Sequence, residues 1–507
     1  MAPQALDIEG AVESQKKSMA VDDDGRPART GNEWTALAHL VTAVSGAGVL
    51  SLAWSMSQIG WVAGSIILVL LALATLYSSS LLSDCYRHPD PAAGARNHTY
   101  TKCVNAILGK RQAWFCALAQ YADLYGATVA FTIVASSSIA AIAQSVCYRK
   151  HGKNTPCDAV TGRYTLIFGG IQIFFSQLQD MQRVRWLSIL ATVMSFSYSF
   201  IVLSLSAIKA SEHGHSHGTS FGVLVGSNML VHVTTYQKTL GVLQAIGNMC
   251  YSFLFTSILI EIQDTLSSSP PENKTMRKTL LIGIVYTTMF YMALGGTGYA
   301  AYGDKTPGNL LSALVSYRHV FWLVDLANLF IIVRLVGAYQ VTAQPIFGFV
   351  EFHASIYFQR KIMPNEKQPS HAVLPLQKKS SLDHLTIFRI VWRTSFVILT
   401  TMISMAFPFF NSILGLLGAL AYWPLTIYFP IQMHMKKFDV QPWSSKWVGL
   451  QILMLFFLLV SFSCIAGSIE GIRQSMKKTS SIPNLIWIGT ILSCLIIYCC
   501  PLHYIIS

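Results

Sequence analysis

Glycines interrupt two long apolar runs of this chain, and each interruption could expose backbone groups to a ligand. The first run, residues 42–51, carries Gly46 and Gly48 near its middle. A glycine within a helix costs about 1 kcal/mol relative to alanine, so the pair favours a break, although small residues also permit close helix packing. A half-helix that begins after the break would direct its first N–H groups at an anion. The residues expected to bind a carboxylate are Ser45, Gly46, Ala47 and Gly48.

The second interruption lies at Gln244-Ala-Ile-Gly-Asn-Met249. If the helix unwinds here, the carbonyls of Ala245, Ile246 and Gly247 can accept hydrogen bonds from an ammonium group, with Asn248 beside them. Irregular backbone is tolerated at membrane depth where it lines such a site. One site with an anion-binding end and a cation-binding end suits a zwitterionic amino acid. Paired breaks separated by five helices also predict two inverted halves of five helices each.

Four ionisable residues, His39, Asp123, Asp325 and Arg334, lie within apolar runs. Such residues are costly in a membrane and are usually functional, although a fixed structural ion pair is the alternative. His39 precedes the first interruption by about two helical turns, and histidine exchanges a proton near neutral pH. We therefore take His39 and Asp123 as the candidates for proton coupling.

The elements that must position these residues are transmembrane helices. Of the 507 residues, 52% are hydrophobic and only 12% are charged, about half the charged fraction of soluble proteins. Apolar runs of about 20 residues, enough to cross the bilayer as a helix, recur along the chain. We expect spans at 35–56, 61–83, 113–144, 164–179, 187–208, 240–266, 279–301, 320–346, 387–405, 408–434 and 447–469. The run 482–500 could form a twelfth helix.

Charge patterning predicts the orientation. Lys and Arg are about twice as frequent in the connections on the N-terminal side as in the others, which places the N-terminus in the cytoplasm. Because the net charge of +13 resides in these loops, nucleic acid is not expected as a partner. We divide the chain into a cytoplasmic tail (1–33), a transmembrane domain (34–470) and an atypical C-terminal segment (471–507).

The cysteines and histidines indicate one disulfide and no metal site. Cys147 and Cys157 are ten positions apart in a connection that we expect to face outside, where a disulfide persists. The ten cysteines show no CxxC pair and no zinc spacing. The alternating His213, His215 and His217 could bind zinc or copper, but no intramembrane ligand cluster follows to receive the ion. Metal-ion transport and a non-transporting membrane receptor stay as alternatives.

No nucleotide-binding loop and no catalytic-triad spacing occurs in the sequence. We therefore expect neither an enzyme nor an ATP-driven pump, and no cofactor. Coupling to an ion gradient is favoured instead.

Several short sequence stretches, which follow one another along the chain, resemble a known family. They are Gly31–His39, Gly48–Trp54, Gln58–Trp61, Arg96–Tyr100, Leu259–Leu266, Gly337–Val341, Pro408–Asn411 and Trp423–Pro430. Together they resemble the plant amino acid permeases, a family of the amino acid/auxin permease superfamily. The resemblance covers roughly residues 30 to 470. It implies an all-α, LeuT-like fold of about 11–12 helices with broken first and sixth helices. It also implies a plasma-membrane location and proton-driven uptake of amino acids. An auxin-like carrier is the alternative within the superfamily, and the sequence fixes neither the preferred amino acids nor the oligomeric state.

Two departures from the family concern charged residues. The family usually has Asn at the position of Asp123 and His at the position of Arg334, so the two changes together conserve net charge. LeuT-like folds bring the third and eighth helices together. We therefore expect Asp123 and Arg334 to form a charge pair, which would leave His39 as the better proton carrier.

Overall fold

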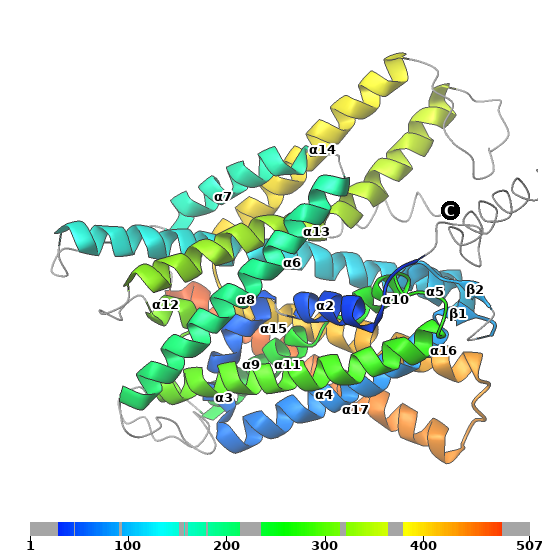
Figure 1. The fold of residues 1–507 in the computed structure, drawn as a ribbon, viewed down its shortest axis with the longest axis horizontal. Coiled ribbons are helices and arrows are strands. Elements are labelled where there is room, and N and C mark those ends of the chain that lie inside the picture. The colour runs from blue at the N-terminus through cyan, green and yellow to red at the C-terminus, as the bar shows by residue number, and fades with distance from the viewer. Residues whose placement is uncertain are drawn as a thin grey trace, which may run out of the picture.

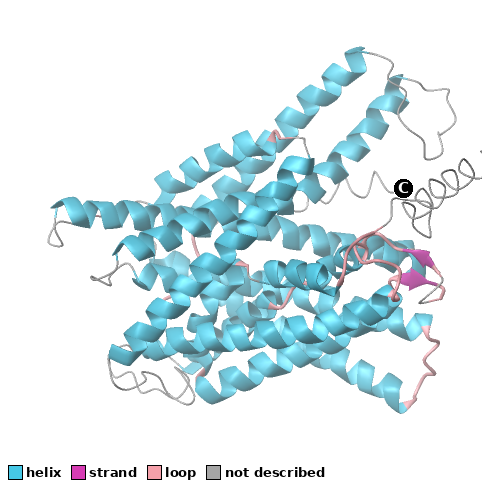
Figure 2. Ribbon diagram, viewed as in Figure 1, coloured by secondary structure: helices cyan, strands magenta, loops and turns pink. Residues whose placement is uncertain are grey.

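The computed structural model is a bundle of long helices (Figure 1). It describes residues 29–478 apart from 45, 91–93, 152–156, 158–160, 179–180, 213–234, 315–320 and 363–378. Figure 2 shows helix nearly everywhere and one small hairpin at one end of the bundle. That hairpin pairs β1 (Arg87–His88) with β2 (Ala95–Arg96) in antiparallel register.

Eleven helical segments correspond in order to the eleven spans predicted between residues 35 and 469. The first half comprises α2 (Glu33–Val44) with η1 (Ala47–Ser51) and α3 (Leu52–Ile59), α4 (Trp61–Cys85), α6 (Lys110–His151), α7 (Thr161–Ser176) and α8 (Met181–Glu212). The second half comprises α9 (Thr235–Ser252) with η3 (Thr256–Ile258) and α10 (Leu259–Gln263), α11 (Glu272–Tyr302), α13 (Phe321–Ile362), α14 (Lys379–Ala406), and α15 (Phe410–Ala421) with η5 (Tyr422–Tyr428) and α16 (Phe429–Lys437). The eleventh segment is α17 (Ser445–Lys478). Short helices α5 (Tyr100–Leu108), η4 (Gly303–Lys305) and α12 (Leu310–Leu314) lie in the connections.

Nine of the described helices are long and apolar enough to cross a membrane, and the bent pair formed by α2 and α3 makes a tenth. α7 has only 16 residues, somewhat less than the bilayer core requires of an upright helix. The longest helices, α6 and α13, have 42 residues each, which at 1.5 Å per residue exceeds a bilayer thickness. The predicted run at 482–500 lies outside the described residues.

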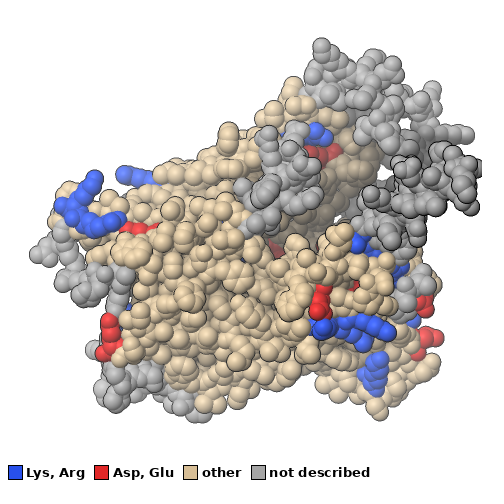
Figure 3. Space-filling model, in the orientation of Figure 1, with Lys and Arg blue, Asp and Glu red and all other residues tan. Residues whose placement is uncertain are grey.

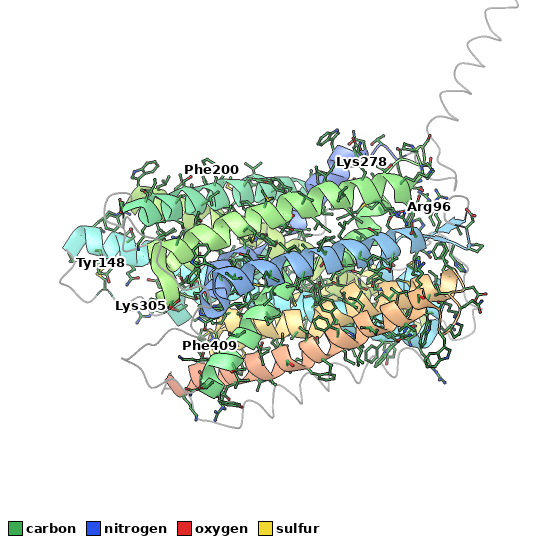
Figure 4. The ribbon with its side chains drawn as sticks, turned by 90° about the horizontal axis from the view of Figure 1, so that it is seen from below. Arg96, Tyr148, Phe200, Lys278, Lys305 and Phe409 are labelled. Atoms are coloured by element: carbon green, nitrogen blue, oxygen red, sulfur yellow. A yellow bond between two sulfur atoms is a disulfide. The ribbon has the colours of Figure 1, made fainter. Side chains whose placement is uncertain are left out.

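Charged side chains gather toward the two ends of the bundle, and the face between them is mostly uncharged (Figure 3). Figure 4 places Arg96 and Lys278 at one end and Tyr148 and Lys305 at the other. The sequence-based topology assigns these two pairs to opposite sides of the membrane. The chain is therefore a multi-pass membrane protein whose helices run between two polar ends.

Local chemistry explains how the helices turn and bend. Gly60, with φ of 96°, joins α3 directly to α4, because glycine adopts this left-handed conformation without strain. In the tenth segment Pro424 lies within the π-helical turn η5 and Pro430 follows it, and their missing backbone N–H groups loosen the regular ladder.

The packing of the segments follows a regular scheme. The first contacts the sixth through α3 and α9, the second contacts the seventh through α4 and α11, the third contacts the eighth through α6 and α13, and the fourth contacts the ninth through α7 and α14. η1 and α15 each pack against both α9 and α6, and so connect the first of these pairs to the third.

Candidate functional site

The first helix is broken where the glycines predict it. α2 ends at Val44, and the chain turns by 50° before it continues as η1 and α3. Gly46 is extended, its N–H donates to the Val44 carbonyl at 2.6 Å, and its own carbonyl accepts from Val49 at 3.3 Å. The N–H of Gly46 is therefore already bonded, whereas those of Ala47 and Gly48 precede the first bond within the new helix. Ser45 lies outside the described residues.

The second break lies further along the chain than predicted. α9 continues as a helix through Ala245, Ile246, Gly247 and Asn248 and ends only at Ser252. A turn over residues 253–255 then leads into η3. The prediction that residues 245–247 unwind and offer free carbonyls is wrong, because these carbonyls lie inside a regular helix.

Gly247 serves helix packing instead. A Cβ on Gly247 would lie 2.6 Å from the Gly415 carbonyl of α15, and one on Gly418 would meet the Gly247 carbonyl. The neighbouring Asn248 is fully buried, and its amide has no hydrogen-bond partner among the described residues. A Cβ on Gly415 would lie 3.0 Å from the Asn248 Oδ1. The glycines thus let α9 and α15 approach closely. Small residues in membrane helices commonly serve such packing, which is the alternative to a helix break.

The two breaks adjoin each other. The hydroxyl of Tyr291, on α11, lies 2.8 Å from the Val44 carbonyl and 2.7 Å from the Ser252 carbonyl. Because the hydroxyl has one proton, it donates to one of these carbonyls at a time. A Cβ on Gly48 would lie 2.9 Å from the Ser252 Oγ and 3.3 Å from the Tyr251 ring. Gly48 is therefore required for contact between the two breaks, whatever it binds.

Arg334 approaches the first break from α13. Its guanidinium is buried, and its Nε donates to the Ser195 Oγ on α8 at 2.6 Å. The Nη2 atom lies 3.8 Å from the position that a Cβ on Gly46 would occupy. One turn along α8, the Tyr198 hydroxyl lies 3.5 Å from the Gly46 carbonyl. A fixed cation therefore stands directly beside the interrupted backbone.

Asp123 lies on α6, which packs against both η1 and α13. Among the residues that the structure describes, the Asp123 Oδ1 has no hydrogen-bond partner, although the side chain is only 8% exposed. The predicted direct ion pair between Asp123 and Arg334 is absent, and Arg334 bonds to Ser195 instead. Both residues nevertheless lie on helices that pack against each other.

The remaining predicted residues lie elsewhere. His39 is exposed on α2, so the structure does not enclose the two proton-coupling candidates together. Asp325 pairs with Arg149 at 2.6 Å. Cys147 and Cys157 form the expected disulfide, with 6.0 Å between their Cα atoms. The run of His213, His215 and His217 lies outside the described residues, within which no group of three or more His, Cys, Asp or Glu side chains could hold a metal ion.

Three residues of this neighbourhood were missed from the sequence: Tyr291, Ser195 and Tyr198. Each carries a hydroxyl on an apolar helix, and such residues are frequent in membrane helices for ordinary packing reasons. The spacing of Ser195 and Tyr198, three positions apart on one helix face, is a weak signal that they share a neighbour.

Comparisons with known proteins agree with this architecture. Residues 29–474 match the family model described as transmembrane amino acid transporter protein. Amino acid permease 3 of Arabidopsis thaliana is 45% identical over 463 residues, which cover 91% of this chain and 94% of the relative. Amino acid permease 8 of the same plant is 46% identical over 94% of this chain and 98% of its own. Lysine histidine transporter-like 1 of Arabidopsis thaliana is 24% identical over 483 residues, which cover 93% of this chain and 95% of the relative. The chain therefore belongs to the transmembrane amino acid transporter family, a family of transporters and not of enzymes.

Proposed function

We propose that this protein imports amino acids across the plasma membrane, with its N-terminus in the cytoplasm, by proton-coupled symport through residues 34–470. The observation that carries the proposal is the meeting of two broken helices beside a buried guanidinium that has no carboxylate partner among the described residues. Interrupted helices at membrane depth offer backbone groups to a polar substrate. The printed names of the relatives support amino acids as that substrate.

A five-plus-five inverted repeat of the LeuT-like kind is part of the proposal. The contacts that support it recur when each segment is replaced by the one five places along. Thus α6 packs on α14 as α13 packs on α7, and α4 packs on α16 as α11 packs on α8. Likewise α6 packs on α15 as α13 packs on α8. A pseudo-symmetric pair of halves can rock about a central site, which is the basis of alternating access.

One end of the bundle is held together by buried ion pairs, as alternating access requires of a closed gate. Glu272, 1% exposed, accepts from Arg29 at 2.9 Å and from Arg87 at 2.6 Å. Nearby, the Tyr86 hydroxyl donates to Asp264 at 2.6 Å. The labelled Arg96 and Lys278 lie at this end in Figure 4. We assign it to the cytoplasmic side.

The corrected geometry changes the residues assigned to the site. For the carboxylate we retain Gly46–Gly48, in particular the N–H groups of Ala47 and Gly48. For the ammonium we replace residues 245–247 by the turn at 253–255. His39 and Asp123 are the two candidates for the coupling proton.

Uptake of a panel of radiolabelled amino acids into a transport-deficient cell tests the function. We expect uptake to rise as external pH falls, because substrate and proton must both bind before the halves rock. A protonophore should abolish uptake, and replacement of sodium should leave it unchanged. Sodium-dependent uptake would overturn proton coupling. Uptake of an auxin-like aromatic acid in place of amino acids would favour the other carrier type of the superfamily.

A further inference from the structure

Two buried ionisable side chains, on the packed helices α13 and α6, do not pair with each other. Arg334 is 6% exposed and Asp123 is 8% exposed. The Arg334 Nε bonds to a neutral hydroxyl, and no carboxylate pairs with its guanidinium among the described residues. Within the described residues, the Asp123 Oδ1 also accepts no hydrogen bond. An unpaired buried charge is unfavourable and is normally offset by an opposite charge nearby. Each of these side chains therefore lacks a partner that a ligand could supply.

The position of each charge indicates which part of a ligand it meets. The Arg334 Nη2 lies 3.8 Å from the Cβ position of Gly46, beside the start of the second half-helix. A carboxylate at that point would meet both the guanidinium and the positive end of the helix dipole. Asp123 lies on α6, which packs against both η1 and α13, so its carboxylate belongs to a helix that borders the first break and the helix of Arg334.

We propose that Arg334 binds the carboxylate and Asp123 binds the ammonium group of the transported amino acid. The two residues then select zwitterions, which carry both charges. This inference rests on the proposed function and adds side-chain contacts to its backbone contacts. A guanidinium offers paired N–H donors that match the two oxygens of a carboxylate. Because Asp123 must be ionised to bind ammonium, the coupling proton falls to another group, and His39 is the remaining candidate.

The rival explanation is a structural pair bridged by water. In that case the two charges stabilise the fold together and contribute nothing to selectivity. The double variant Arg334→Gln/Asp123→Asn distinguishes the two. A structural pair predicts that the double variant restores both folding and transport relative to either single variant, because no charge is left stranded. Substrate recognition predicts that the double variant folds but still binds the amino acid poorly.

The experiment measures uptake of the amino acid that the wild-type chain transports best, in competition with its methyl ester and its deaminated acid. The ester lacks the carboxylate and the acid lacks the ammonium group. We expect Arg334→Gln to raise KM about 10-fold or more, since a charge-assisted hydrogen bond is lost, and to reduce discrimination against the ester. Asp123→Asn should reduce discrimination against the deaminated acid. Arg149→Gln, which removes an exposed cation paired with Asp325, is the matched control and should change neither ratio.

A second variant covers the case in which Arg334→Gln does not fold. Gly46 adopts an extended conformation that alanine shares, and its new methyl group would meet only ordinary contacts of 3.6 Å or more. Gly46→Ala should therefore fold, place a methyl group beside Arg334 and raise KM. Gly170→Ala, whose methyl group meets nothing within 4 Å, is its control. Surface expression and thermal unfolding in detergent report folding separately.

The outcomes separate this inference from the proposed function. A wild-type chain that takes up no amino acid contradicts the function. A transporting wild type with unchanged KM and unchanged discrimination in Arg334→Gln and Gly46→Ala overturns the charge assignment alone. Selective loss of acidic amino acids in Arg334→Gln, with neutral ones unaffected, also overturns it, because Arg334 would then bind a side-chain carboxylate.

Discussion

A single hydroxyl, that of Tyr291, joins the two interrupted helices. Val44 and Ser252 each end a helical half, and their carbonyls lie within hydrogen-bond distance of it. The ring itself is fully buried and packs edge-on against Phe253. Carbonyls at helix ends need partners from outside the helix, and none can come from lipid. Tyr291 therefore holds the relative position of the two breaks.

Replacing Tyr291 with phenylalanine tests this role. The change keeps the ring and removes the donor, so a buried carbonyl loses its partner. We expect the free energy of unfolding to fall by about 1–3 kcal/mol and uptake to fall with it. Tyr286→Phe, on the same helix but exposed, is the control. Equal unfolding temperatures for the two variants in detergent would contradict the assignment.

At the residue scale, sequence reasoning found the charges and missed the hydroxyls. Asp123 and Arg334 stand out in apolar helices because an ionisable group is costly there. Their direct pairing was inferred from helix proximity, which does not fix where long side chains point. Ser195, which actually bonds to Arg334, carries no such cost and gives no comparable signal.

At the element scale, the first break was predictable and the second was not. Gly46 lowers helix propensity locally, and the helix is interrupted there. The turn at 253–255 contains neither glycine nor proline. Side chains of distant helices instead bond to polar groups directly after the turn. Gln120 donates to the Ser257 carbonyl at 2.9 Å, and Thr256 bonds to Thr426 at 3.1 Å. Contacts between distant segments cannot be found from local composition.

Gly247 gives a test of this correction. A methyl group at Gly247 would collide with the Gly415 backbone, and overpacking of this kind costs about 1–3 kcal/mol. We expect Gly247→Ala to lower the unfolding temperature and surface expression, while the molecules that reach the membrane keep the wild-type KM. Gly348→Ala, with nothing within 4 Å of the new methyl group, should change neither. A raised KM at normal stability would instead return Gly247 to the substrate site.

At the scale of the whole molecule, the order of the spans followed directly from hydropathy. A run of about 20 apolar residues has few alternatives to a transmembrane helix. The disulfide followed from two cysteines in one connection. Hydropathy does not show that α6 and α13 extend well beyond the bilayer thickness, nor that a hairpin and α5 cover one end. Those features depend on polar contacts at the membrane surface, which hydropathy does not describe.

The ion pairs at that end give a test of alternating access. The Gly31 N–H donates to the Thr265 carbonyl at 3.2 Å, so the N-terminal segment contacts the end of the sixth span. Glu272, on the seventh span, pairs with Arg29 of that segment and with Arg87, which follows the second span. Glu272→Gln removes the carboxylate that Arg29 and Arg87 share, which should loosen this end and favour the state open toward it. Cys85 and Cys103, both fully buried nearby, are native reporters of that opening.

We expect N-ethylmaleimide to modify Cys85 and Cys103 faster in Glu272→Gln than in the wild type, as measured by peptide mass spectrometry on purified protein. Cys250 and Cys464 lie buried elsewhere in the bundle and should keep their rates if the opening is local. General unfolding would accelerate all four, so the ratio of the two pairs identifies a gate. Glu470→Gln removes a partner of the more exposed Arg473 and should leave the ratio unchanged. If Glu272→Gln also leaves it unchanged, the ion pairs at this end do not hold the gate, because removing their shared anion should release both arginines together.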